Sequence, residues 1–264
     1  MSPAAAIDEN LRMAMRFFGE ATGTGSIVRL PGVLALYSGL DYGVFNIAML
    51  EGHEELPLRA ADFEQSLRKT ADFFSGYSKR WSLWLWEDLL EPAEMREARR
   101  LMSQRNLRNI SSPPGMICRT LEPPRRELPA IELRHVSDGP TRKAFAELTA
   151  LAFEIPYMIT QIVYEPERAW RGAYQGWVAY RNEEAVASVA TVTAAGVLGI
   201  YSLATHPARR RRGFGEAILR AAVEHAQPPG ESLPLVLQST DAGYALYRRL
   251  GFRDAARFSV YLTQ

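Results

Sequence analysis

Cysteine is almost absent from the chain, which has one in 264 residues. That residue, Cys118, cannot form an internal disulfide, so nothing points to an oxidising compartment. We expect Cys118 to be a small buried hydrophobic residue within a strand.

Long hydrophobic runs and an export signal are also missing. The longest apolar window, Val192–Ala204, is interrupted by Thr, Gly and Ser and is too short to cross a bilayer. Residues 1–20 lack a basic leader, carry Asp8 and Glu9, and have the spacing of an amphipathic helix. We therefore expect a cytoplasmic protein with no membrane partner.

The chain has no large excess of charge of either sign. The formal net charge is +1, which argues against a general nucleic-acid binder, although basic residues gather at 209–212 and 248–257. Four adjacent arginines would also suit an RNA-binding or nuclear-localisation patch, but no aromatic residues are interleaved with them. We expect no nucleic-acid partner.

A segment rich in proline and charge divides the chain at residues 121–129. This composition favours an extended, exposed linker. The length of the chain suits two domains of ordinary size. We predict one domain over residues 1–122 and a second over residues 130–264.

The second part has the periodicity of an α/β domain with an antiparallel meander. Alternating polar and apolar residues indicate strands, and apolar stripes three to four residues apart indicate helices. In order, we predict a strand at 131–136, helices at 138–154 and 157–169, strands at 174–181, 184–193 and 196–205, a helix at 213–226, a strand at 233–238, a helix at 241–250 and a strand at 258–263.

Residues 199–219 carry the most chemical information. An apolar extended run ends at Pro207, passes through four arginines and two glycines, Gly213 and Gly215, and opens into an amphipathic helix. This layout suits a pyrophosphate, because unpaired N–H groups at a helix N-terminus attract phosphate oxygens. Glycines let the backbone approach the anion closely.

Two other phosphate-binding loops do not fit this segment. A Walker loop would need Lys and Ser or Thr where Glu216 and Ala217 stand. A dinucleotide-binding fingerprint would need a third glycine at the position of Ile218.

What remains is R-x-x-G-x-G, formed by Arg210, Gly213 and Gly215. This motif resembles the acetyl-CoA signature of the GNAT-type N-acetyltransferase superfamily. Residues 239–252 resemble the family's other recurrent element, a short helix ending in L-Y-x-x-x-G-F, one helix and one strand further on. The resemblance implies the acyl-CoA N-acyltransferase fold, an α/β (α+β) architecture with a mixed sheet splayed at the cofactor strand.

The resemblance also implies a reaction, in which a primary amine of a small molecule or protein attacks the thioester of acetyl-CoA directly, without a metal. Tyr247 is then the candidate acid that protonates the departing thiolate, whereas Tyr244 on the same helix face is expected to pack on the sheet. The residues expected to bind acetyl-CoA are Leu203, Ala204, Thr205, Arg210, Arg211, Arg212, Gly213, Phe214, Gly215 and Tyr247.

The general base stays open at this point. Glu154, Glu165 and Glu167 lie in the helical region that lines the acceptor site in the family, but each is also explained as a solvated charge. His206 and Asp241 lie beside the expected position of acetyl-CoA. Both also have structural explanations, Asp241 as a helix N-cap.

The N-terminal part shows a similar order of elements. We predict helices at 5–19, 58–76 and 92–107, strands near 26–30, 33–38, 43–49 and 81–87, and extended segments at 108–121. The loop at 51–57, which takes the place of the arginine loop, is acidic and would repel a pyrophosphate. We therefore predict two such domains in tandem, the first degenerate and without cofactor.

Two further interpretations stay open. Trp81, Trp84 and Trp86 alternate with leucines, which favours a strand buried on both faces over a stacking platform. The alternative to an enzyme is a non-catalytic CoA-binding module in regulation or assembly, against which the intact Gly213 and Tyr247 argue. The acceptor and the oligomeric state, including a homodimer, stay undetermined.

Overall fold

The computed structural model of the chain describes residues 1–52, 55–77 and 79–264. Within these ranges seven α-helices combine with one mixed sheet of twelve strands. The helices are α1 (Pro3–Glu20), α2 (Ala60–Ser75), α3 (Pro92–Gln104), α4 (Gly139–Phe153), α5 (Tyr157–Tyr164), α6 (Phe214–Ala226) and α7 (Asp241–Arg249). The strands are β1 (Ser26–Leu30), β2 (Val33–Tyr37), β3 (Ile47–Leu50), β4 (Ser82–Trp86), β5 (Leu107–Ser111), β6 (Pro114–Cys118), β7 (Glu132–His135), β8 (Gln175–Arg181), β9 (Glu184–Ala194), β10 (Val197–Thr205), β11 (Leu235–Gln238) and β12 (Arg253–Thr263).

The order of elements predicted from the periodicity is confirmed, with three differences. The helix predicted at 157–169 stops at Tyr164 and is followed by a 3₁₀ turn at Glu167–Arg171. The strand predicted near 43–49 begins only at Ile47, after another 3₁₀ turn. The last strand begins at Arg253, five residues before the predicted start.

Local sequence explains several of the turns and caps. The hairpin between β8 and β9 turns at Asn182 and Glu183, and the next one turns at Ala195 and Gly196, all four with positive φ. Two such residues in a row match the right-handed twist of the flanking strands. Asp138 caps α4, where its carboxylate accepts the Thr141 N–H. The meander is therefore held by one tight turn at each end of β9.

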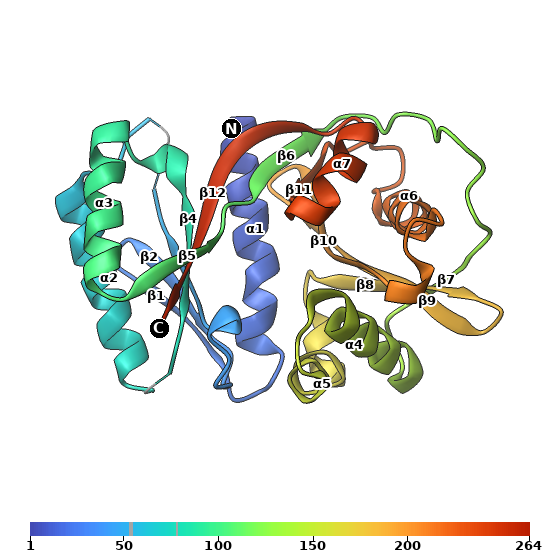
Figure 1. The fold of residues 1–264 in the computed structure, drawn as a ribbon, viewed down its shortest axis with the longest axis horizontal. Coiled ribbons are helices and arrows are strands. Elements are labelled where there is room, and N and C mark those ends of the chain that lie inside the picture. Colours follow the sequence, from blue (N-terminus) through green and yellow to red (C-terminus); the bar gives the residue numbers. More distant parts are fainter. Residues whose placement is uncertain (53–54, 78) are drawn as a thin grey trace.

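The last strand is shared between the two halves of the molecule, which we define as residues 1–122 and 130–264. The first part of β12 pairs with β6, and Phe258–Thr263 continues between β4 and β5. In return, β6 of the N-terminal half lies between β12 and β11. Each half thus contributes one strand to the sheet of the other, and Figure 1 shows β12 crossing from one side of the molecule to the other.

Helix α1 lies between the two halves and contacts strands of both. The predicted amphipathic helix is confirmed, with Leu11, Met15 and Phe18 buried on one side. The polar residues Asp8, Asn10 and Arg12 are buried as well, which the spacing did not indicate. Arg12 pairs with Asp8 at 2.6 Å and donates to the Leu50 carbonyl. Burial is the main influence on Asp8 and raises the pKa of its carboxyl, while Arg12 opposes that rise.

Asn10 connects α1 to the C-terminal half. Its side-chain amide donates to the carbonyls of Val192, Ala194 and Val197, at 3.0, 3.1 and 3.3 Å. Its Oδ1 accepts the Tyr201 hydroxyl at 2.6 Å. A single buried side chain therefore joins α1 to both β9 and β10.

Gly199 makes room for this contact. A Cβ added at Gly199 would lie 1.9 Å from Asn10 Oδ1, a separation that no real Cβ tolerates. The glycine in β10 is therefore explained by the close approach of α1.

The predicted linker at 121–129 is extended and largely exposed, and Cys118 is buried at the end of β6, both as expected. Burial raises the pKa of the Cys118 thiol. Among the described residues, no helix has the length and apolar character needed to cross a membrane.

Replacing Asn10 with alanine is expected to lower the free energy of unfolding by about 1–3 kcal/mol, because the buried partners of the amide lose their hydrogen bonds. Chemical denaturation followed by circular dichroism measures the change. Asn109→Ala, at an exposed asparagine on β5, is the matched control and should alter stability far less. Equal effects of the two substitutions would contradict the assigned role of Asn10.

Ending the chain after Arg257 removes the part of β12 that lies between β4 and β5. We expect the amides of β4 and β5 to lose protection from hydrogen exchange, because their ladder partners are gone. Exchange read out by mass spectrometry, with the intact chain as reference, tests this. Unchanged protection of β4 and β5 would show that the exchanged strand is dispensable.

Candidate active site

Strand β10 separates from its neighbour β11 partway along its length. The two strands pair in parallel only at Leu198 with Leu235 and at Gly199 with Val236. On its other side β10 has a bulge against β9, between Tyr201 and Ala204, with Ser202 at φ 46°. The edge of β10 that faces β11 is therefore unpaired beyond Gly199, which leaves backbone groups available to a ligand.

The arginine loop follows directly and ends at the N-terminus of α6. Gly213 is the N-cap, with φ 93° and no side-chain cap, so the first N–H groups of the helix have no capping side chain. A Cβ on Gly215 would lie 3.1 Å from Thr205 Oγ1, which places this glycine close to the end of β10. The strand end and the helix N-terminus together form a concave backbone surface.

The four arginines of the loop have different surroundings. Arg209 pairs with Glu184, and Arg210 donates to the carbonyls of Thr205 and Ala152 at 3.4 Å. Arg211 and Arg212 are exposed, and their guanidinium groups form no ion pair or hydrogen bond with any described residue. These two are the cations of the loop that stay available for an anion.

The interdomain linker also reaches this loop, which the sequence did not indicate. Arg126 donates to the Arg211 carbonyl at 3.2 Å, and Pro129 Cδ would lie 2.9 Å from a Cβ on Gly213. The linker therefore packs against the candidate phosphate site. The composition of the linker predicted only that it would be exposed to solvent, because contacts between distant segments leave no local pattern in the sequence.

Tyr247 lies on α7 with 8% of its surface exposed, and it lines a cavity beside Leu203. Burial raises the pKa of its phenol far above the ordinary value, and no described residue hydrogen-bonds its hydroxyl. The side chain is therefore neutral at physiological pH. Tyr244 is instead half-buried against the core of the C-terminal half, and its hydroxyl donates to Asp254 at 3.1 Å.

None of the candidate bases lines this cavity, as far as the described residues show. Glu165 accepts a hydrogen bond from Tyr157 at 2.7 Å, and Glu167 pairs with Arg171. Glu154 caps the end of α4 and is exposed. The remaining two also lie elsewhere: His206 lines a separate small cavity, and Asp241 is exposed. The predicted N-cap role of Asp241 is wrong, because Thr240 caps α7.

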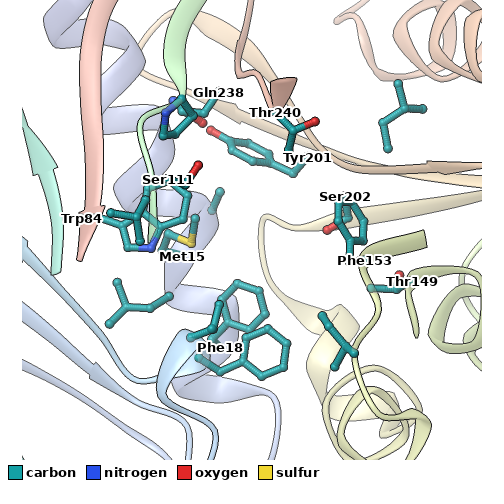
Figure 2. A pocket seen from close by; sticks show the side chains of 18 of the residues that line it. Met15, Phe18, Trp84, Ser111, Thr149, Phe153, Tyr201, Ser202, Gln238 and Thr240 are labelled. Carbon is teal, nitrogen blue, oxygen red and sulfur yellow. The ribbon is translucent and has the colours of Figure 1, made fainter. Parts of the chain in front are cut away.

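The cavity has a volume of about 400 Å³ and lies between the two halves. Figure 2 shows Gln238, Ser111 and Trp84 along one wall and Ser202, Phe153 and Thr149 along the other. The predicted buried strand at 81–87 is confirmed, with Trp81 and Trp86 in the core. Trp84, however, lies on the cavity wall, so this strand also contributes to the site.

Buried tyrosines make up much of the remaining wall. The hydroxyl groups of Tyr174 and Ser202 lie 2.7 Å apart, and Tyr201 donates to Asn10. Burial raises the pKa values of Tyr164, Tyr174 and Tyr201 above the ordinary value. All three are therefore neutral at physiological pH, and none can serve as a base there.

Comparison with known proteins agrees with this geometry. Residues 172–254 match the model of the acetyltransferase (GNAT) domain. No curated protein matches the chain. The chain therefore contains a GNAT acetyltransferase domain, which comprises the unpaired end of β10, the arginine loop and α7.

Solved structures extend the likeness to the whole chain. A GCN5-related N-acetyltransferase from Kribbella flavida has a TM-score of 0.73 at 20% identity, over 100% of this chain and 96% of that one. Another from Sphaerobacter thermophilus has a TM-score of 0.57 at 16% identity, over 99% and 94%. A Staphylococcus epidermidis protein, described as functionally unknown, has a TM-score of 0.63 at 13% identity, over 90% and 94%. The predicted fold is confirmed, and the family transfers acyl groups from acetyl-CoA.

Gly213→Ala is expected to weaken acetyl-CoA binding, because alanine disfavours φ 93° and its Cβ would meet Pro129. Titration calorimetry should show an affinity at least about tenfold lower, since each tenfold corresponds to about 1.4 kcal/mol.

Gly230→Ala is the matched control for this substitution. Gly230 also has positive φ, at 78°, but it lies in the loop after α6 and has open space around it. Both variants should lose some stability, while only the first should lose affinity. An equal loss of affinity in both would contradict a phosphate site at Gly213.

Proposed function

We propose that the chain transfers an acetyl group from acetyl-CoA to the amine of an acceptor by direct attack. The observation that carries this proposal is the unpaired edge of β10, which ends directly at the glycine-capped N-terminus of α6. In the proposal, pantetheine pairs with the backbone at Leu203, Ala204 and Thr205. The pyrophosphate is bound by the N–H groups of residues 213–215, next to the unpaired Arg211 and Arg212.

The reaction develops charge on three atoms: the amine nitrogen, the carbonyl oxygen and the thioester sulfur. The amine lone pair forms a C–N bond with the thioester carbon, and the carbonyl oxygen becomes an oxyanion. Backbone N–H groups at the β10 bulge are suitable donors to that oxygen, and one such donor typically contributes about 2.7–4 kcal/mol. The C–S bond then breaks and Tyr247 donates its proton to the thiolate, while the cationic nitrogen loses one proton, which restores the Tyr247 hydroxyl.

For the domains, we propose that residues 130–264 carry the catalytic site and that residues 1–122 form a degenerate acetyltransferase-like domain. The acidic loop at 51–57 that supports this includes residues 53 and 54, which lie outside the described residues. The N-terminal half nevertheless supplies β6 and part of the cavity wall, so we expect the C-terminal half to need it.

A second candidate is a CoA-binding module without catalysis, since no carboxylate or imidazole among the described residues lines the cavity. Thermal stabilisation by acetyl-CoA without release of CoA in the presence of any amine would favour that candidate. Release of CoA that depends on the amine favours the enzyme.

Tyr247→Phe is expected to lower kcat by about 10²–10⁴-fold, the usual contribution of a general acid, with little change in acetyl-CoA affinity. Thiol release at saturating acetyl-CoA measures kcat, and calorimetry measures affinity.

Tyr244→Phe serves as the control, since that phenol lies three residues earlier on α7 but donates to Asp254, outside the residues that line the cavity. Normal turnover by Tyr247→Phe would remove the acid role from Tyr247. Normal turnover by Tyr244→Phe, together with reduced turnover by Tyr247→Phe, would support the acid role of Tyr247.

A further inference from the structure

The cavity between the halves has an uncharged wall. Every described residue that lines it is neutral, and nine of the 24 are aromatic residues from both halves, among them Phe18, Trp84 and Phe153. A volume of about 400 Å³ is within the range of small-molecule sites. Moving a charged group from water into such surroundings is costly unless a partner of opposite charge is present.

Four polar atoms of residues on this wall have no hydrogen-bond partner among the described residues, and each is covered by its neighbours, so an acceptor reaches them when these side chains rotate toward the cavity. They are both amide atoms of Gln238, the indole Nε1 of Trp84 and the hydroxyl of Thr149. A buried polar atom without a hydrogen-bond partner typically costs about 1–3 kcal/mol of stability. Such atoms therefore indicate that a bound molecule supplies the missing hydrogen bonds. Gln238 can donate and accept, whereas Trp84 can only donate.

The side chain of Gln238 faces the acceptor side of the sheet. Along β11, Leu237 packs in the core beneath α6 and α7, whereas Val236 packs in the core that includes α1. Because side chains alternate along a strand, Gln238 shares the face of Val236. It therefore points away from the candidate pyrophosphate loop and into the space between the halves.

The neutral wall also bears on the protonation state of the acceptor. Alkyl amines have pKa values near that of lysine, about 10.4, and are ammonium ions at neutral pH. An ammonium ion cannot attack, and the described wall offers no carboxylate or imidazole to remove its proton. Aromatic rings can attract a cation, but that attraction would hold the amine in its unreactive form. An aromatic amine is already neutral and needs no base before attack.

From these observations we propose that the acceptor is a neutral aromatic amine bearing a carboxamide-like group, which pairs with Gln238 and accepts from Trp84. This inference rests on the proposed acetyl transfer. The arylamine nitrogen forms the new C–N bond, the C–S bond breaks, and the nitrogen proton passes to the thiolate through the Tyr247 hydroxyl. The products are an N-aryl acetamide and CoA.

Three compounds of nearly the same shape test the charge preference with the full-length protein and acetyl-CoA. 4-Aminobenzamide is neutral, 4-aminobenzoate carries a carboxylate, and 4-(aminomethyl)benzamide carries an ammonium group. We expect kcat/KM for 4-aminobenzamide to exceed that for either charged compound at least tenfold. Calorimetry with CoA-loaded protein should show the same order of affinity.

Gln238→Leu tests the role of the amide, with aniline as the control compound because it lacks the carboxamide. We expect kcat/KM to fall about tenfold for 4-aminobenzamide, the equivalent of one hydrogen bond, and to stay within about twofold for aniline. The affinity for acetyl-CoA should not change. An equal loss for both amines with weaker acetyl-CoA binding would assign Gln238 to pantetheine and overturn the inference.

The two levels of proposal fail in different ways. If acetyl-CoA binds but a charged compound is preferred, or 4-aminobenzamide does not bind to the CoA-loaded protein, acetyl transfer stands and the neutral-acceptor inference is wrong. If acetyl-CoA itself does not bind, the proposed function fails, and the inference fails with it.

Discussion

The exchange of strands β6 and β12 is the constraint on which the rest of the molecule depends. Backbone hydrogen bonds place Phe258–Thr263 between β4 and β5, and place β6 between β11 and β12. Neither half therefore has a complete sheet of its own. The exchange fixes the distance between the halves, and α1 fills the space that this leaves, anchored by Asn10. The aromatic cavity is a product of that arrangement.

Within this frame, one local irregularity creates the candidate chemistry. The bulge at Ser202 turns the end of β10 away from the regular ladder, and pairing with β11 stops after Gly199. Backbone groups that would otherwise be used in the sheet become available beside Leu203 and Tyr247. The same strand contributes Tyr201, which is held by α1. The candidate site and the junction between the halves are therefore connected through β10.

Sequence alone predicted most elements, because hydrophobic periodicity and turn residues such as Asn182 and Gly196 act locally. It also predicted that the arginine loop would join a strand to a helix and that Tyr247 would lie on a short helix, because these patterns are local; their roles in binding and catalysis stay predictions. It could not predict which strands Phe258–Thr263 would join, since alternation specifies a strand but not its partners. It did not predict the burial of Asn10 and Arg12 in α1, because their partners lie in distant segments. The cavity was missed for the same reason, with Trp84 and Gln238 far apart in sequence.

The order of the exchanged strands along the chain has a consequence for synthesis on the ribosome. The nascent N-terminal half emerges first, but the strand that separates β4 from β5 is translated only after β7–β11 and the helices between them. Until then β4 presents an open hydrogen-bonding edge, and open edges of this kind invite pairing with other chains. Closure of both halves of the sheet must therefore wait until β12 has been synthesised, so the two halves complete their folding together rather than one after the other.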